Sequence, residues 1–335
     1  MRKLLSLVLL VLLAWSGYWF GTATLASRAA EDWRLKRLAE GWKANWTGPE
    51  TNGFPASFSS VVKDIDVKDT SGLFGWKAAE VQIDVPSYWP TAANAVWPKN
   101  MEILLGGETV TVAADRLETG LGLAPNASLT LNELTVVADD LVLDGRGWTA
   151  VLGQGRLSTR QTSGLDYAHD MLLYLRDLAP PAAILRLIDP AGQQPLYLDE
   201  LRTTVTAAFD APLDRTALKN GPPALTMLEI TEFETGWGDI GLEANGQVKF
   251  DAQGVPDGRI EIRVENWLAA FEIAKALGVV RPELEQTILR TLEALASVSG
   301  TPGDIDAPLS FQKGFMSFGP IPLGPAPRVA PRQRQ

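Results

Sequence analysis

Two kinds of periodicity divide the chain. From residue 29 to about residue 46, apolar side chains recur every three or four positions, whereas from Gly53 onward they alternate with polar ones. A repeat of 3.6 residues is typical of an amphipathic helix, and a repeat of two is typical of a strand with one buried face. The pattern therefore predicts a helix over 29–46 that is followed by a mainly β domain.

The alternation is clearest in two segments. In KAAEVQIDV, Val81 and Ile83 alternate with polar residues, and in ETVTVAADRL, Val110 and Val112 do the same. Each segment predicts a strand with one buried face. Together with less regular segments the pattern predicts about a dozen strands, the others spanning residues 128–138, 140–143, 148–158, 171–175, 196–209, 225–235, 240–251, 259–264 and 307–319.

Glycine-rich turns such as Asp144-Gly145 and Asn245-Gly246 separate most of these strands. Short turns join antiparallel neighbours, while parallel strands need crossover helices, which the pattern lacks. The fold class that we expect is therefore mainly β (α+β): long curved antiparallel meander sheets with a few packing helices. These helices are predicted at residues 180–190, 267–277 and 282–297, and the region 179–194 is a candidate junction between two halves of the sheet.

A Gly-Phe-Pro corner at 53–55 stands between the predicted helix and the first long strand. Proline is tolerated at a strand start, because no ladder hydrogen bond needs its missing N–H group. Beyond the corner the apolar positions change from even to odd numbers at Val61-Val62. One extra residue in a β-bulge shifts the parity in this way, so we predict a bulge there.

The longest apolar run is at the N-terminus. Arg2 and Lys3 precede seventeen uncharged residues from Leu4 to Phe20, and the next charge is Arg28. A membrane-spanning helix needs about 17–25 such residues, whereas the apolar part of a signal peptide has about 7–15. We expect an uncleaved anchor, with a cleaved signal peptide and, least supported, a buried helix of a soluble domain as the alternatives. Four aromatic residues are predicted to lie at the membrane interface: Trp15, Tyr18, Trp19 and Phe20.

The chain is thus predicted to have four parts. Residues 1–26 are the anchor or signal-like segment, and residues 27–47 are a membrane-proximal amphipathic helix. That helix either lies on the bilayer or caps a hydrophobic core. Residues 48–319 form the exported antiparallel β domain, and the proline-rich tail of 320–335 is predicted to be irregular. The orientation that we expect is one span in the inner membrane with the main domain in the periplasm.

Composition restricts the chemistry. The chain has no cysteine, a single histidine and a net charge of −10. These features exclude thiolate and multi-histidine metal sites and disfavour nucleic acid as a partner. His169 lies between Asp166 and Asp170, but on a strand these carboxylates would face away from the imidazole. We therefore expect no catalytic, cofactor-binding or metal-binding residues and no enzyme activity; a hydrolase using His169 is the least supported alternative.

The apolar face of so many amphipathic strands must be covered by something. Whatever the helices leave uncovered would be a second sheet or a groove for acyl chains. Our leading hypothesis is a membrane-anchored envelope protein that binds lipid or another hydrophobic ligand on a concave sheet face. The alternative is a structural or assembly factor that contacts other envelope proteins. Residues predicted to line the core or the ligand site are Phe54, Phe58, Val81, Ile83, Val110 and Val112.

Several short motifs occur in an order that resembles a known family. They are GFP at 53–55, GWKAAEVQI at 75–83, LDY at 165–167, GQVKFDAQGVPDGRIEIRVENW at 246–267 and PLSFQKGFMSFGPIPLGPAPRV at 308–329. With the N-terminal anchor, they resemble the uncharacterised membrane-anchored alphaproteobacterial proteins of domain of unknown function family 2125. This resemblance implies no catalytic residues. The strands also look similar to those of AsmA-like envelope proteins, whose folds imply long curved sheets and, for some, phospholipid transport.

Overall fold

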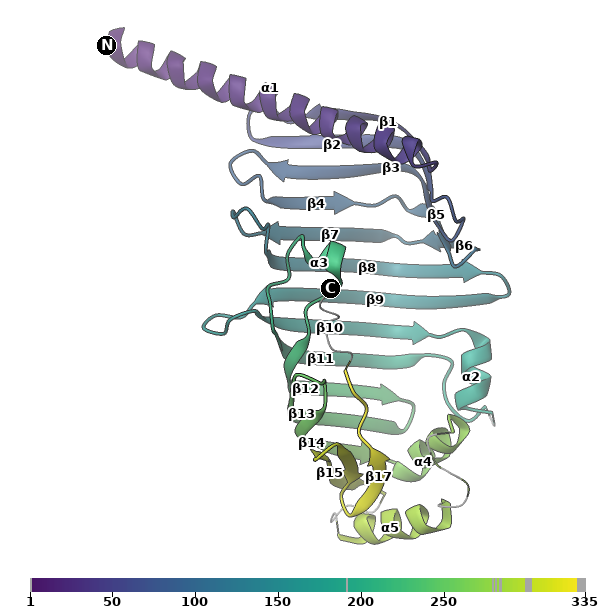
Figure 1. Ribbon diagram of the computed structural model, residues 1–335. Helices are drawn as coiled ribbons and strands as arrows, with labels where there is room; N and C mark the ends of the chain where they lie inside the picture. The colour runs from purple at the N-terminus through teal and green to yellow at the C-terminus, as the bar shows by residue number, and fades with distance from the viewer. Residues whose placement is uncertain are drawn as a thin grey trace. The chain divides into compact units, whose positions relative to one another are not determined.

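The structure is a computed structural model that describes residues 2–190, 192–278, 280, 282, 285–298 and 303–329. In these residues the chain is mainly β, with 17 strands in one long antiparallel sheet and five helices, the first of which is apolar (Figure 1). The predicted fold class is confirmed in these respects. The chain forms two compact units: unit 1 is Met1–Gly122 with Ala138–Gly147, and unit 2 is Leu123–Val137 with Trp148–Gln335.

Unit 1 contains one helix and the first strands of the chain. These are α1 (Arg2–Ala39), β1 (Lys43–Asn52), β2 (Ser57–Lys68), β3 (Phe74–Pro86), β4 (Ala92–Val96), β5 (Asn100–Leu105), β6 (Glu108–Ala113), β7 (Arg116–Leu123) and the second half of β8 (Leu131–Gly145). Strand β3 pairs with β5 through Phe74–Ala78 and with β4 through Gln82–Asp84, so two short strands lie beside one long one. Strands β6 and β8 pair beyond β5.

Helix α1 combines the predicted anchor with the predicted amphipathic helix and ends before the predicted residue 46. The expected anchor and amphipathic helix are one continuous helix that ends at Ala39. Gly41, with a φ of 85°, turns the chain, and β1 then begins at Lys43. The prediction of helix up to residue 46 is therefore wrong. The corner at 53–55 joins β1 to β2, and does not join a helix to a strand as predicted.

The side-chain face of β2 does change along the strand, but not at the predicted place. Val61 and Val62 pair in regular register with β3, so no bulge separates β2 from β3 there. Val62 and Ile65 nevertheless pack in the same hydrophobic core. Between them Asp64 has a φ of 53°, which aspartate tolerates better than most residues. The parity of the apolar positions therefore changes at Asp64.

Unit 2 is a meander in which each strand from β9 to β17 pairs with the next. Its strands are β9 (Trp148–Gln161), β10 (Ala168–Ala179), β11 (Leu198–Phe209), β12 (Leu225–Trp237), β13 (Ile240–Phe250), β14 (Pro256–Glu265), β15 (Ile305–Gln312), β16 (Phe315–Phe318) and β17 (Ile321–Pro325). Its helices are α2 (Ala182–Ile188), α3 (Ala217–Asn220), α4 (Trp267–Ala276) and α5 (Glu285–Val298). The predicted junction at 179–194 lies inside this unit.

The end of the chain differs from its prediction. The expected single strand at 307–319 is the hairpin of β15 and β16. The described part of the tail is ordered, because β17 pairs with β16 and the N–H of Val329 donates to Gly254 O at 3.0 Å. The prediction of an irregular tail is therefore wrong for Ile321–Pro325, which form β17, whereas residues 326–329 have no regular secondary structure and residues 330–335 lie outside the described residues. Helix α5 (Glu285–Val298) agrees with the predicted helix over residues 285–297, and residues 283 and 284 near its predicted start lie outside the described residues.

Each unit has its own hydrophobic core. In unit 1, buried residues of β2, β3, β5 and β6 form a cluster against which Trp42, Trp46 and Trp76 pack. In unit 2, helices α4 and α5 cover the last strands, with Trp267, Phe271 and Leu292 packed against Ile305. Among the described residues, α4 and α5 thus cover the apolar face of the last strands of unit 2.

Candidate apolar ligand site

The middle of α1 is attached to unit 1 by hydrogen bonds from aromatic side chains. Trp15 and Trp19 donate their indole N–H groups to backbone oxygens at positions 55 and 57, at 3.0 and 2.9 Å. The hydroxyl of Tyr18 donates to the backbone oxygen of Ser87 at 3.0 Å. Three of the four predicted interface residues therefore hold the helix against the β1–β2 and β3–β4 turns.

Ring contacts complete this attachment. Trp19 is buried and stacks on Phe58 with 5.4 Å between ring centroids. Phe20 stacks on Phe54 at 5.8 Å, and both of these rings remain well exposed. Phe58 is thus a packing residue, and Phe54 lies at the surface beside α1.

The end of α1 is attached to β1 by a second aromatic group. The rings of Trp33 and Trp46 are 5.7 Å apart, and the Arg37 guanidinium lies 5.6 Å from the Trp33 ring and 5.4 Å from the Trp42 ring. Arg37 also pairs with Glu40 at 2.6 Å. Cation–π contacts contribute about 0.5–1 kcal/mol each at exposed sites, so the two contacts of Arg37 help to hold the end of α1 against β1.

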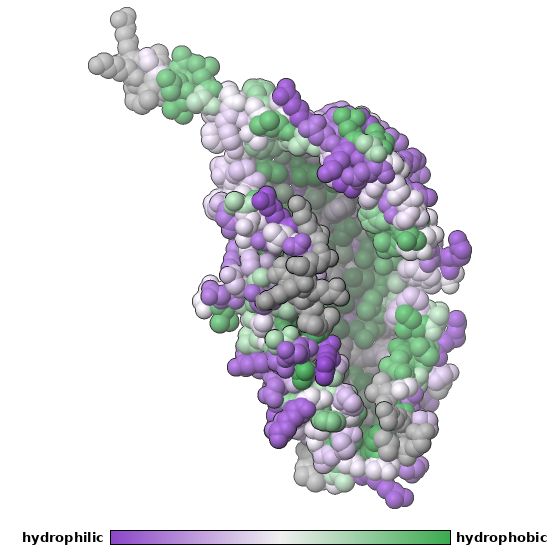
Figure 2. All heavy atoms as spheres, in the orientation of Figure 1, coloured by the Kyte–Doolittle hydropathy of each residue, from purple (hydrophilic) through white to green (hydrophobic). Residues whose placement is uncertain are grey.

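An apolar cleft lies between this end of α1 and strands β1, β2 and β3. Its volume is about 460 Å³, within the range of small-molecule pockets. The helix, the following turn and β1 contribute Ala30, Trp33, Trp42 and Trp46. The two hairpin strands contribute Val62, Ile65, Val67, Phe74, Trp76, Val81 and Ile83. Figure 2 shows hydrophobic residues gathered in the recess beside α1.

The six residues predicted to line a core or ligand site occupy three different places. Val81 and Ile83 line the cleft, and Ile83 is 36% exposed. Val110 and Val112 are buried on β6, and Val112 belongs to the core of unit 1. Phe54 and Phe58 lie at the attachment of α1, as described above.

Sequence reasoning missed the four tryptophans of the cleft. Trp33, Trp42 and Trp46 have helical spacing, so the sequence analysis assigned all three to one helix. In the structure Trp33 lies on α1, whereas Trp42 and Trp46 lie beyond its end and face it across a turn. On β3 the residues that pack in the core change from even positions, at Trp76 and Ala78, to an odd one, at Val81, so Trp76 does not continue the alternation that identifies Val81. Its indole N–H is buried without a hydrogen-bond partner, which is costly in an apolar environment.

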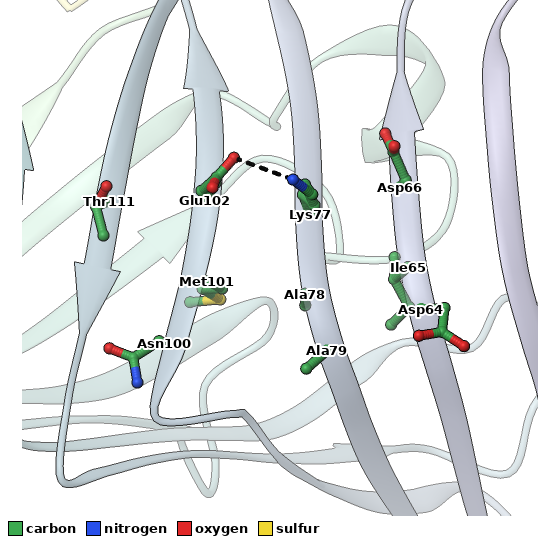
Figure 3. Close-up of a pocket in the computed structure, with 10 residues that line it drawn as sticks. All are labelled: Asp64, Ile65, Asp66, Lys77, Ala78, Ala79, Asn100, Met101, Glu102 and Thr111. Carbon is green, nitrogen blue, oxygen red and sulfur yellow. Dashed lines mark ion pairs between the residues drawn. The ribbon is translucent and has the colours of Figure 1, made fainter.

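A second hollow of about 450 Å³ lies against β2, β3, β5 and β6 and is lined by more polar than apolar residues (Figure 3). Lys77 Nζ and Glu102 Oε2 are 3.9 Å apart across it, and both side chains are well exposed. Exposed ion pairs contribute only about 0–1 kcal/mol. Asp64 and Asp66 border the hollow, but among the described residues no three potential metal ligands come together. We interpret the hollow as a solvated sheet face.

His169 is enclosed in the sheet of unit 2. It is 2% exposed, and its Nδ1 lies 3.3 Å from the hydroxyl oxygen of Thr159. Burial lowers the pKa of His169 below its ordinary value, although the charge of Asp170 opposes this shift. The Asp170 carboxylate is exposed and accepts hydrogen bonds from Thr162 and Thr206. This arrangement, with carboxylate and imidazole on opposite faces, is typical of a structural histidine.

Residues 19–327 match the family described as "Uncharacterized protein conserved in bacteria (DUF2125)". The chain belongs to this family. The match begins at the buried Trp19 and includes every described strand of both units, which confirms the family that the motifs resemble. The alphaproteobacterial origin and the similarity to AsmA-like proteins stay predictions. No curated protein and no solved structure matches the chain.

This family member also has an apolar strand face within unit 2. Cross-strand pairs place Met171, Val205 and Ile230 in one row across β10, β11 and β12. Their neighbours on the other face include Arg202, which pairs with Glu200 at 2.7 Å. The three apolar side chains are only half-buried. Unit 2 therefore retains accessible apolar surface of its own.

Proposed function

We propose that the protein is a membrane-anchored, non-enzymatic envelope protein that binds the acyl chain of a membrane lipid in the apolar cleft. The observation that carries the proposal is the lining of the cleft: eleven side chains, all apolar, around about 460 Å³. One wall of the cleft is α1, a helix long and apolar enough to cross a membrane.

The chemistry of the lining selects the class of ligand. Each CH₂ group that moves from water into an apolar site contributes about 0.8 kcal/mol, so a long hydrocarbon chain gains strongly from this cleft. A polar ligand would lose its hydration without gaining hydrogen bonds in return. Lipid acyl chains meet the first condition and are supplied by any membrane next to α1.

The helix also supports the proposed location. Its candidate span lies within Leu9–Ala39, which contains an 18-residue window with a mean hydropathy of 1.4, and charged residues enter this range only from Arg28 onward. The uncharged part of α1, residues 4–27, suits the bilayer, while the part from Arg28 suits water. We propose that α1 anchors the chain in the inner membrane and that both units lie in the periplasm.

A matched pair of variants tests lipid binding. Ala30 lines the cleft, whereas its neighbour Ala29 is exposed on the same helix. We expect the full-length Ala30→Trp protein, whose cleft would be filled by the indole, to retain roughly tenfold less lipid, equivalent to about 1.4 kcal/mol. Ala29→Trp should retain as much as the wild type. Lipid would be counted by mass spectrometry after purification from membranes in detergent.

Two outcomes would contradict the proposal. One is a wild-type protein that is purified without bound lipid under conditions in which its fold is intact. The other is an equal amount of lipid in the Ala30→Trp and Ala29→Trp proteins. A lipid-free protein that crosslinks reproducibly to other envelope proteins would instead favour the role of an assembly factor.

A further inference from the structure

We propose that the β1–β2 and β3–β4 turns of unit 1 form a membrane-contacting surface, so that the apolar cleft is reached from the bilayer without passage through water. This surface consists of Phe20 on α1, Phe54 in the first turn, and Tyr88 and Trp89 in the second. The inference rests on the proposed function, because it assumes that α1 crosses the bilayer whose lipid enters the cleft.

The length of α1 carries the argument. The segment Arg2–Ala14 precedes the attached aromatic residues, and in Figure 1 the start of α1 extends beyond the ends of β1, β2 and β3. Its 13 residues span about 20 Å, whereas the hydrocarbon core of a bilayer is about 30 Å thick. About seven more residues are needed, which places residues 15–21 inside or at the edge of the bilayer. A tilted helix would need still more residues.

The attached turns must follow the helix to that depth. Trp15, Tyr18 and Trp19 donate hydrogen bonds to both turns, as described above. The turns are also joined to each other, because the Ser87 hydroxyl donates to the backbone oxygen of Pro55 at 2.8 Å. A bilayer that contains residues 15–21 of α1 therefore contacts both turns.

The composition of the turns provides a second, independent argument. The four side chains of the membrane-contacting surface are between 48% and 73% exposed, although all are large and aromatic. Residues 51–62 and 85–98 contain no charged side chain, in a chain with 21% charged residues. Exposed aromatic rings without nearby charges are typical of the boundary between membrane and water.

An apolar strip connects this surface to the cleft. On β2 and β3 the cross-strand pairs Phe58–Val85, Ser60–Ile83 and Val62–Val81 lie on one face, and Ile83 and the last pair line the cleft. Val62 follows Phe58 by four positions, which is about 13 Å along the strand. An acyl chain that leaves the bilayer beside α1 can therefore slide along hydrophobic side chains into the cleft.

The absence of cysteine makes the surface directly testable. Single cysteines at Tyr88 and Trp89 would carry a spin label in the full-length protein, reconstituted in nanodiscs of phosphatidylethanolamine and phosphatidylglycerol. Leu10→Cys serves as the reference for the bilayer, because Leu10 is exposed on α1. Leu73→Cys is the matched control: Leu73 is exposed in the β2–β3 turn, about 40 Å away along β3.

We expect the labels at positions 88 and 89 to collide with oxygen more often than with a water-soluble nickel chelate, as the label at position 10 does. The label at position 73 should show the opposite preference. If position 10 is in lipid and positions 88 and 89 are in water, the membrane-contacting surface is refuted while the proposed function stands. If position 10 is in water, the anchor itself is refuted, and the Ala30→Trp comparison then decides lipid binding separately.

Discussion

Trp19 combines two properties that determine how α1 is held. Its ring is buried against Phe58 at 5.4 Å, and its indole N–H finds an acceptor in the backbone oxygen of Ser57 at 2.9 Å. A buried tryptophan needs both the apolar contact and the hydrogen bond. The same amphipathic character also suits tryptophan to a membrane interface. One residue type thus serves both the attachment of α1 and, as we propose, its position at the bilayer edge.

His169 makes the stability of unit 2 depend on pH. Burial lowers its pKa in the folded protein below the ordinary value of about 6.5, so the unfolded chain binds a proton first as the pH falls. The contribution of neutral His169 to the free energy of unfolding is therefore fully present above pH 6.5. It decreases as the pH falls from 6.5 toward the lower pKa of the folded state.

We predict that His169→Gln, which cannot be protonated but keeps a hydrogen-bonding side chain for Thr159, removes part of this pH dependence. Hydrogen exchange of β9, β10 and β11, corrected for intrinsic rates, would report the opening free energy at pH 7.5 and pH 5.5. The difference between these two values should be smaller in the variant than in the wild type. An equal or larger difference would show that His169 does not titrate in this way.

The residue patterns predicted which side chains are buried better than they predicted the residues that these side chains contact. The alternation around Val110 and Val112 correctly indicated two buried positions on β6. The aromatic residues of α1 were equally visible, but their acceptors are backbone oxygens 38 to 69 residues away, such as that of Pro55 for Trp15. No local pattern contains such a contact, because it depends on how the hairpin β2–β3 folds back.

At the scale of elements, tertiary contacts decided where α1 ends. Trp42 and Trp46 continue its helical spacing, yet Gly41 has a positive φ and both tryptophans pack on the sheet. The glycine was a usable stop signal, whereas the burial of the tryptophans was not visible in the sequence. Strands β4 and β5 were missed for a related reason: each is short and pairs with only part of β3.

Within unit 2, Val329 in the described part of the tail is held against the turn at Gly254. This residue has a φ of +73°, and an added Cβ would lie 1.8 Å from the backbone oxygen of Val329. The Val329 N–H in turn donates to Gly254 O. Such a close approach of two backbones is possible only without a side chain.

We predict that Gly254→Ala releases the segment 326–329 from unit 2, with at least several-fold faster amide hydrogen exchange at Val329. Gly221→Ala is the matched control, because Gly221 also has a positive φ, of +82°, but open space around the added Cβ. Both variants share the backbone cost of about 0.5–1 kcal/mol, so the difference between them isolates the contact. Equal exchange at Val329 in the two proteins would contradict this interpretation.

At the scale of the whole molecule, the alternating pattern predicted an antiparallel sheet with an apolar face, and membership of the family agrees with the order of the motifs. The alternating pattern did not predict where the cleft lies, because residues as distant in sequence as Ala30 and Ile83 line it. The site exists because α1 is attached near Trp19 and again near Trp33, with the cleft beside the second attachment. Both attachments join residues that are distant in sequence, so composition and spacing alone do not define the site.

The central claim is that a lipid acyl chain occupies the cleft. Ile83 lines the cleft, and the adjacent Gln82 is exposed on the other face of β3, where it bonds to Asp84. A photoreactive benzophenone side chain would replace each residue in turn in the full-length protein, followed by illumination of intact membranes and mass spectrometry of the purified chain. We predict a phospholipid adduct at position 83 and none at position 82. Adducts of equal yield at both positions, or none at position 83, would contradict the account.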